Sequence, residues 1–376
     1  MAVSIVSSPN EICAIDEPIT WELTISDLGT PGVTQKSIGY QLIDSLGRII
    51  AESEIQPVST SYEHPVNLVV PIKQSLITNA PLLQLNTVQD ALGFQTFTLK
   101  YGEITLTLAS GNISGFPLGA SSTSIKVVNC TNNNYFDIID DMTSYKLLTF
   151  KPFNNWYNRK SYDWLYVWGA CTVTVLKDYS ASGGGYTGTT VTTLTGTSAK
   201  VNCIPIGYKH HAGLAGLKTY MVKLTLDGDD TYYKYVGCDD VEDGQPCQIV
   251  YFDIGGGYTS IDCIMTALNP ASNKDILNTY HPYNSKTNGG KQLTNSNTQV
   301  RYNFKRLMPL TQEEQEQWVR FVGAENYYVI LTDQYVQYGM VKFIFDSDLT
   351  LELESGEYFS FNGYIANDLN SANGRQ

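Results

Sequence analysis

Four aromatic residues are spaced so that they could form a binding surface: Tyr162, Trp164, Tyr166 and Trp168. Successive side chains of a β-strand point to opposite faces, so these four project from the same face. Stacked rings on an open face can bind sugars, and Tyr and Trp also fill cores and subunit contacts. Because Leu165 and Val167 make the opposite face apolar as well, the pattern favours a central strand covered on both sides. Three interpretations stay open: protein core, intersubunit contact and carbohydrate platform.

Two groups of acidic residues could also support chemistry. The first comprises Asp227, Asp229, Asp230, Asp239, Asp240, Glu242 and Asp243. Several carboxylates at one point could bind calcium, but no twelve-residue loop with a terminal glutamate is present. The second group, Asp137, Asp140 and Asp141, could supply the carboxyl pair of a glycoside hydrolase. We interpret both groups as solvated acidic segments and expect no metal site.

The glycine run Gly255–Gly257 suggests a phosphate-binding loop, but that loop needs a G-x-G-x-x-G pattern that opens a helix. Here a strand-like segment follows the glycines, so we predict a bend between paired strands. His64 and His281 each precede a proline and are predicted to be exposed loop residues, and no G-x-S-x-G occurs. His210 and His211 are adjacent, so on a strand they would point to opposite faces. We expect no catalytic residue and no cofactor.

The seven cysteines are widely spaced, odd in number and free of C-x-x-C pairs, which indicates buried reduced thiols. The N-terminal segment lacks the basic and apolar regions of a secretory signal. No stretch approaches 18 consecutive apolar residues, so we expect no membrane insertion.

The composition favours a chain built mainly of β-strands. Among 376 residues there are 26 Tyr and 31 Gly, and only 16% are charged. Aromatic and β-branched residues suit a pleated, half-buried surface. The net charge of −13 disfavours direct, backbone-driven nucleic-acid binding, because basic side chains must displace the counterions of the phosphates.

The first 130 residues predict an immunoglobulin-like β-sandwich, because short runs of period two, such as Trp21, Leu23 and Ile25, alternate with turn residues. Residues 131–376 predict a second β-rich domain, in which a division near 250 stays open. This part contains a long polar loop, 269–299, and one capped helix, 311–322, with Thr311 and Glu314 as a capping box.

Three segments carry a resemblance to a known family. They are the SPNEI motif at Ser8–Ile12, the Tyr251–Asp262 strand pair, and the helix of Leu310–Trp318 after the polar run. In this order they resemble virion proteins of tailed bacteriophages that infect Bacteroidetes, crAss-like phages included. The resemblance implies a structural protein of the tail or neck and supplies no catalytic residue.

We therefore expect a non-enzymatic tail or neck-ring protein, made in the host cytoplasm and located in the virion. It would assemble in multiple copies, with other virion proteins, through aromatic β-surfaces. The alternative is a receptor- or glycan-binding module at the tail tip, with a host-surface glycan as partner. A weaker alternative is a glycan-degrading enzyme.

Overall fold

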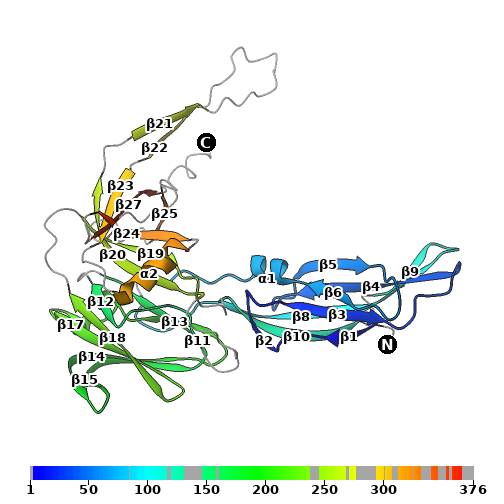
Figure 1. Cartoon of the computed structure of the whole chain (residues 1–376), viewed down its shortest axis with the longest axis horizontal. Helices are drawn as coiled ribbons and strands as arrows, with labels where there is room; N and C mark the ends of the chain where they lie inside the picture. The colour runs from blue at the N-terminus through cyan, green and yellow to red at the C-terminus, as the bar shows by residue number, and fades with distance from the viewer. Residues whose placement is uncertain are drawn as a thin grey trace.

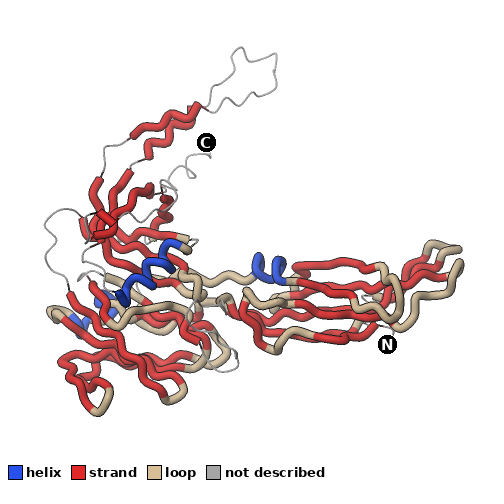
Figure 2. Tube along the Cα trace, in the orientation of Figure 1, coloured by secondary structure: helices blue, strands red, loops and turns tan. Residues whose placement is uncertain are grey.

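A computed structural model of the chain describes residues 3–83, 85–116, 120–130, 146–157, 161–237, 245–267, 271–276, 294–299, 301–306, 312–324, 326–331, 340–345, 353–354 and 358–365. Strands dominate these residues, which confirms the predicted mainly β class (Figure 2). They form three β units, with an N-terminal sandwich extending away from the other two (Figure 1).

The N-terminal unit is an immunoglobulin-like sandwich of two sheets. One sheet orders β1 (Val3–Ser7), β3 (Thr20–Ile25) and β6 (His64–Asn67). The other orders β2 (Ile12–Ala14), β10 (Ser121–Val128), β8 (Phe94–Thr107), β4 (Thr34–Ile43) and β5 (Ile49–Ile55), with β9 (Asn112–Gly115) on β8. Only β2 and β10 pair in parallel among these strands, and the two sheets face each other in the plan of an immunoglobulin domain.

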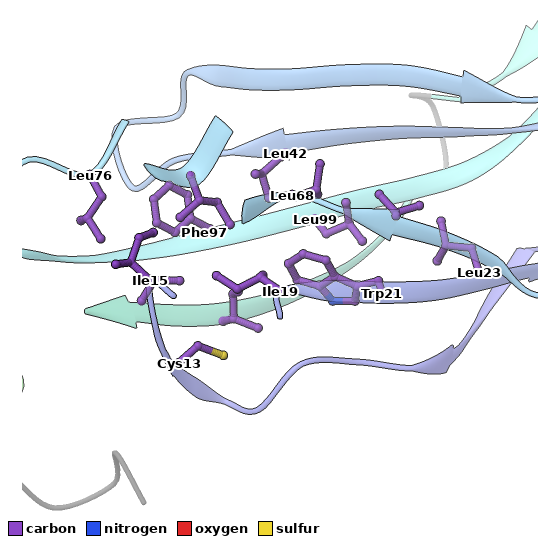
Figure 3. Packing of buried hydrophobic residues seen from close by; sticks show 14 of the residues in the cluster. Cys13, Ile15, Ile19, Trp21, Leu23, Leu42, Leu68, Leu76, Phe97 and Leu99 are labelled. Carbon is purple, nitrogen blue, oxygen red and sulfur yellow. The ribbon is translucent and has the colours of Figure 1, made fainter. Parts of the chain in front are cut away.

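The period-two alternation of the first 130 residues creates the sandwich core. Trp21, Leu23 and Ile25 on β3 are fully buried, whereas the residues between them are partly exposed. They pack with Phe97 and Leu99 of the opposite sheet (Figure 3). Helix α1 (Val69–Ser75) follows β6 and buries Ile72 in the same core.

The second unit is a further pair of sheets. A four-stranded sheet orders β11 (Lys146–Leu147), β13 (Trp164–Trp168), β16 (Val201–Pro205) and β7 (Gln89–Asp90). A five-stranded sheet orders β12 (Asn154–Tyr157), β18 (Asp229–Gly237), β17 (Thr219–Leu226), β14 (Cys171–Ser182) and β15 (Gly185–Gly196). The short 3₁₀ turns η1 (Tyr208–His210) and η2 (Ala212–Leu214) follow β16. Strand β7 comes from the sequence of the N-terminal unit, so the first two units share a sheet.

The third unit is a closed antiparallel barrel. Its strands run in the order β23 (Arg301–Arg306), β20 (Tyr258–Ala267), β19 (Gln245–Phe252), β24 (Tyr327–Leu331), β25 (Val341–Phe345) and β27 (Tyr358–Ile365), and β27 pairs back to β23. The short β26 (Leu353–Glu354) joins β27. The predicted helix is α2 (Gln312–Val322), and its Trp318 and Phe321 are buried against barrel strands; Thr311 lies outside the described residues.

The prediction of a long loop at 269–299 is wrong for the two ends of that segment. Strands β21 (Ala271–Ile276) and β22 (Thr294–Gln299) pair with each other, and they prolong the β20–β23 pair as a ribbon that projects from the barrel (Figure 1). A two-stranded ribbon can form from polar residues because neither of its faces packs against a hydrophobic core. Residues 277–293 lie outside the described part.

Candidate functional site: the buried junction of three β units

The aromatic residues of β13 lie inside the protein. Trp164, Tyr166 and Trp168 are 0%, 0% and 3% exposed, and Tyr162, just before the strand, is half-buried. The core interpretation is therefore confirmed for the three strand residues, and the carbohydrate and intersubunit interpretations are wrong for them. Strand β13 has β11 and β16 on its two sides, so it is a central strand as its two apolar faces predicted.

The two faces of β13 belong to different cores. Leu165 and Val167 pack into the core between the two sheets of the second unit. The aromatic face packs into a separate cluster that also holds residues of the N-terminal sandwich and the barrel: Val128, Cys130, Val250 and Tyr258 among them. One strand thereby contributes to a core that is common to all three units.

Asp163 is a buried charge at the start of β13. Lys151 donates to its Oδ1 over 2.5 Å, Ser260 Oγ donates to the same oxygen over 3.0 Å, and Tyr235 Oη donates to Oδ2 over 2.8 Å. A buried carboxylate needs such partners, because leaving it unpaired would carry a large desolvation penalty. Ser260 belongs to the barrel, so the network of Asp163 ties the second unit to the third.

Two further contacts join the same units. The Gln248 side chain accepts a hydrogen bond from the Tyr162 amide over 2.6 Å and donates to the Tyr162 carbonyl over 2.8 Å. Ser161 Oγ donates to Asp262 Oδ1 over 2.6 Å. The Gln248 side chain thus pairs with the backbone N–H and C=O of Tyr162 in the way that a neighbouring strand would.

The glycine run forms the turn between β19 and β20, as predicted, and Asp253 holds it. The fully buried Asp253 carboxylate accepts hydrogen bonds from the Gly255 amide (3.0 Å), the Phe150 amide (3.0 Å) and Arg320 Nη1 (3.1 Å). Arg320 also pairs with Glu316 at 2.9 Å and stacks over the Phe150 ring. The turn is therefore fixed to helix α2 and to the segment of the second unit between β11 and β12.

Each of the three glycines permits a close approach to a different segment. A Cβ on Gly255 would lie 2.7 Å from the Leu148 carbonyl oxygen. On Gly256, which has φ +103°, it would overlap the carbonyl oxygen of Asn129, at the end of the N-terminal sandwich. On Gly257 it would overlap the side chain of Tyr166 on β13. Glycine is required here because backbones of three units meet at one turn.

Two hollows border the junction. One, of about 330 Å³, is lined by residues that include Leu76, Ile77, Phe252 and Tyr258. The other, of about 500 Å³, is lined by residues that include Leu82, Leu85 and Val88. Their walls combine apolar side chains with polar ones, such as Lys73 in the first hollow and Asp90 in the second.

One carboxylate of the acidic turn after β17, that of Asp230, is paired with its neighbours. Asp230 accepts hydrogen bonds from Lys223 and from Thr225, each at 2.6 Å, and the Lys223 hydrogen bond lowers the pKa of Asp230. Within the described residues, no group of three or more His, Cys, Asp or Glu side chains could hold a metal. Asp137, Asp140, Asp141, Asp239, Asp240, Glu242 and Asp243 lie outside that part of the chain.

The prediction for His64 is wrong, since it lies buried on β6; His281 lies outside the described residues. His210, the last residue of η1, and the adjacent His211 are both buried, and burial lowers the pKa of His210 to about 3. The six described cysteines are all buried, as predicted, and Cys238 lies outside the described residues. Desolvation raises the pKa of Cys203 to about 12, which keeps it a protonated, unreactive thiol.

An accessible aromatic cluster lies elsewhere, on the outer face of the five-stranded sheet. The Tyr186 ring lies 5.3 Å from Tyr232, 6.0 Å from Tyr179 and 6.1 Å from Phe153, measured between centroids. All four side chains are half-buried. Sequence reasoning missed this cluster because its members come from β14, β15, β18 and the residue before β12 and show no common spacing.

Comparison with known proteins adds no family. No protein-family model and no curated protein matches the chain. A solved complex of Dpr2 Ig1-Ig2 with DIP-Theta Ig1-Ig3 is 7% identical, over 98% of this chain and 92% of that one, with a TM-score of 0.22. A mutant Salmonella alpha-2-macroglobulin is 6% identical with a TM-score of 0.21, and the match spans 31% of its length. Such low scores carry no functional argument.

Proposed function

We propose that this chain is a non-enzymatic structural component of a tailed-phage virion, a tail or neck-ring protein present in multiple copies. One observation carries the proposal: the buried charges and the glycine turn serve to fasten three β units together. Asp163 and Asp253, which could have been catalytic carboxylates, each accept three or more hydrogen bonds within this junction.

The fastened junction suits a protein whose task is mechanical. Interdomain contacts that are small and polar permit domain motion, whereas a shared apolar core with buried ion pairs opposes it. The projecting ribbon β21–β22 and the elongated sandwich extend from this centre (Figure 1), which offers separate surfaces for neighbouring molecules. Among the described residues, no helix has the length and apolar character needed to cross a membrane.

The proposal is tested by electron microscopy and native mass spectrometry of the purified protein, together with proteomics of purified virions. We expect a multimer in solution and the chain at high copy number in particles. A stable monomer that is absent from particles would refute the proposal.

The half-buried cluster of Tyr179, Tyr186, Tyr232 and Phe153 favours a second candidate, a glycan-binding module at the tail tip. Aromatic rings that keep part of one face accessible can stack on sugar rings. Glycan-array binding that Tyr232→Ala abolishes, with an unchanged circular dichroism spectrum, would support it. Trp164→Ala serves as the contrast, because loss of that buried ring should impair folding and not recognition.

A further inference from the structure

The last strand of the five-stranded sheet, β15, leaves that sheet with an open edge. Its neighbour in the sheet order is β14 alone, and in the described part of the chain its backbone hydrogen bonds are those of that ladder. The residues Thr187, Gly188, Thr189 and Thr190 are exposed. In Figure 1, β15 lies at the outer margin of the second unit, away from the junction. An open edge presents a row of amide and carbonyl groups that another strand can bind.

The sequence of this edge lacks the usual protection. Between Gly185 and Gly196 there is no charged residue and no proline, whereas the open edge strand β5 carries the exposed Glu52 and Glu54. Inward of the open segment, an extra residue at Val191 forms a bulge between the pairs Val175–Thr192 and Leu176–Thr190. A second irregularity lies between the pairs Lys177–Thr189 and Ser180–Thr187, but its extra residue is on β14, so it adds none to the β15 edge. A bulge interrupts regular pairing, so the edge available to a partner strand is Gly185–Thr190.

Aromatic packing holds this segment in place before any partner arrives. Tyr186 packs against Tyr232, Tyr179 and Phe153, and a Cβ on Gly185 would lie only 2.5 Å from Tyr232 Oη. A strand that is already extended loses little conformational entropy when a second strand pairs with it.

We propose that Gly185–Thr190 pairs, antiparallel, with the same segment of a second copy of the chain, about a two-fold axis at Gly188. This register opposes Thr187 to Thr189 of the second copy, and Tyr186 to Thr190, each twice. Thr–Thr and aromatic–β-branched pairs stabilise antiparallel sheets, and an isologous contact needs only one self-complementary surface.

The lack of charge on this edge permits contact between two acidic copies. Each copy has a net charge of −13, so two copies repel over most of their surfaces. The uncharged segment is a place where they can meet without bringing carboxylates together. The inference rests on the proposed function, because it names the surface through which copies of a virion protein join.

Two double variants that differ only at residue 187 test the pairing. Thr187→Glu with Thr189→Glu opposes like charges twice across the axis, whereas Thr187→Lys with Thr189→Glu opposes unlike charges twice. We expect the first to raise the dimer dissociation constant at least about 10-fold and the second to stay within about 3-fold of the parent. Val58→Glu with Ser198→Glu, at exposed loop positions, has the same net charge as the first variant and should associate like the parent.

Sedimentation velocity over a concentration series gives the dissociation constants, and urea unfolding confirms that each variant folds. A monomeric parent, or equal dissociation constants for both edge variants, would overturn the pairing; the second result would assign association to a different surface. Virion proteomics keeps the two proposals apart. If the chain is present in particles but both edge variants have the dissociation constant of the parent, only the pairing is rejected. If the chain is absent from particles but the edge variants differ as expected, only the virion role is rejected.

Discussion

Replacing Gly256 by alanine should separate the units that meet at the β19–β20 turn. Gly256 has φ +103°, and an added Cβ would overlap the carbonyl oxygen of Asn129. Asn129 follows β10, the strand that leads out of the N-terminal sandwich, and its backbone cannot retreat without disturbing Val128 and Cys130 in the shared core.

The size of the effect has two parts. A positive φ costs an alanine about 1–2 kcal/mol relative to glycine, and overpacking a tight contact costs about 1–3 kcal/mol more. Gly256→Ala should therefore lower the free energy of unfolding by about 2–5 kcal/mol. Gly184→Ala is the matched control, because Gly184 has φ +87° and nothing within 4 Å of its Cβ position, so only the first part applies.

Equilibrium urea unfolding, followed by tryptophan fluorescence, measures both variants. The emission reports on the junction through Trp164 and Trp168 and on the sandwich through Trp21. We expect the Gly256→Ala variant to lose at least about 1 kcal/mol more than the control and to become more sensitive to proteolysis at the junction. Equal losses in the two variants would show that the backbones do not approach as closely as described.

Three further predictions follow from the buried groups. Asp163→Asn should lower the free energy of unfolding, measured in urea, by about 3–5 kcal/mol, because it leaves the Lys151 ammonium without a counter-charge. Adding Lys151→Met should restore much of that free energy. If the double variant is no more stable than Asp163→Asn, the two residues do not form the ion pair. His210, with a pKa of about 3 when folded and 6.5 when unfolded, binds more protons in the unfolded chain, so its contribution to stability is full above pH 6.5 and declines as the pH falls toward 3. His210→Gln should therefore shrink the stability difference between pH 7 and about pH 4.5 by about 2–3 kcal/mol, and an unchanged difference would place this histidine in water. Burial raises the pKa values of the Cys13, Cys171 and Cys203 thiols to about 12, 11 and 12. We expect these thiols to resist alkylation at pH 8 until urea unfolds the chain, as measured by mass spectrometry. Rapid labelling of the folded protein would contradict their burial.

Local patterns in the sequence predicted the elements better than the contacts between them. Alternation of apolar and polar residues is sufficient to predict β3, and the apolar character of both faces is sufficient to predict the two-sided burial of β13, because each pattern lies along one strand. The partners of Asp163 could not be predicted, since Lys151, Tyr235 and Ser260 lie 12, 72 and 97 residues away and no spacing rule connects them.

The errors have a similar cause. The following Pro65 predicts an exposed loop at His64, but β6 is an edge strand, where a proline is tolerated. The polar run 269–299 predicts a loop because it lacks an apolar face, which a two-stranded ribbon does not need.

Strand β7 joins the first two units through a shared sheet. The two residues Gln89 and Asp90, which lie between β6 and β8 of the sandwich, complete the edge of the sheet that contains β13. A cut near residue 130 would therefore not produce two complete structural units, since the downstream fragment would lack the edge strand that the upstream fragment supplies. During synthesis β7 emerges long before β16 (Val201–Pro205), so it has no partner in that sheet until residues past 200 leave the ribosome, and the sheet can be completed only then.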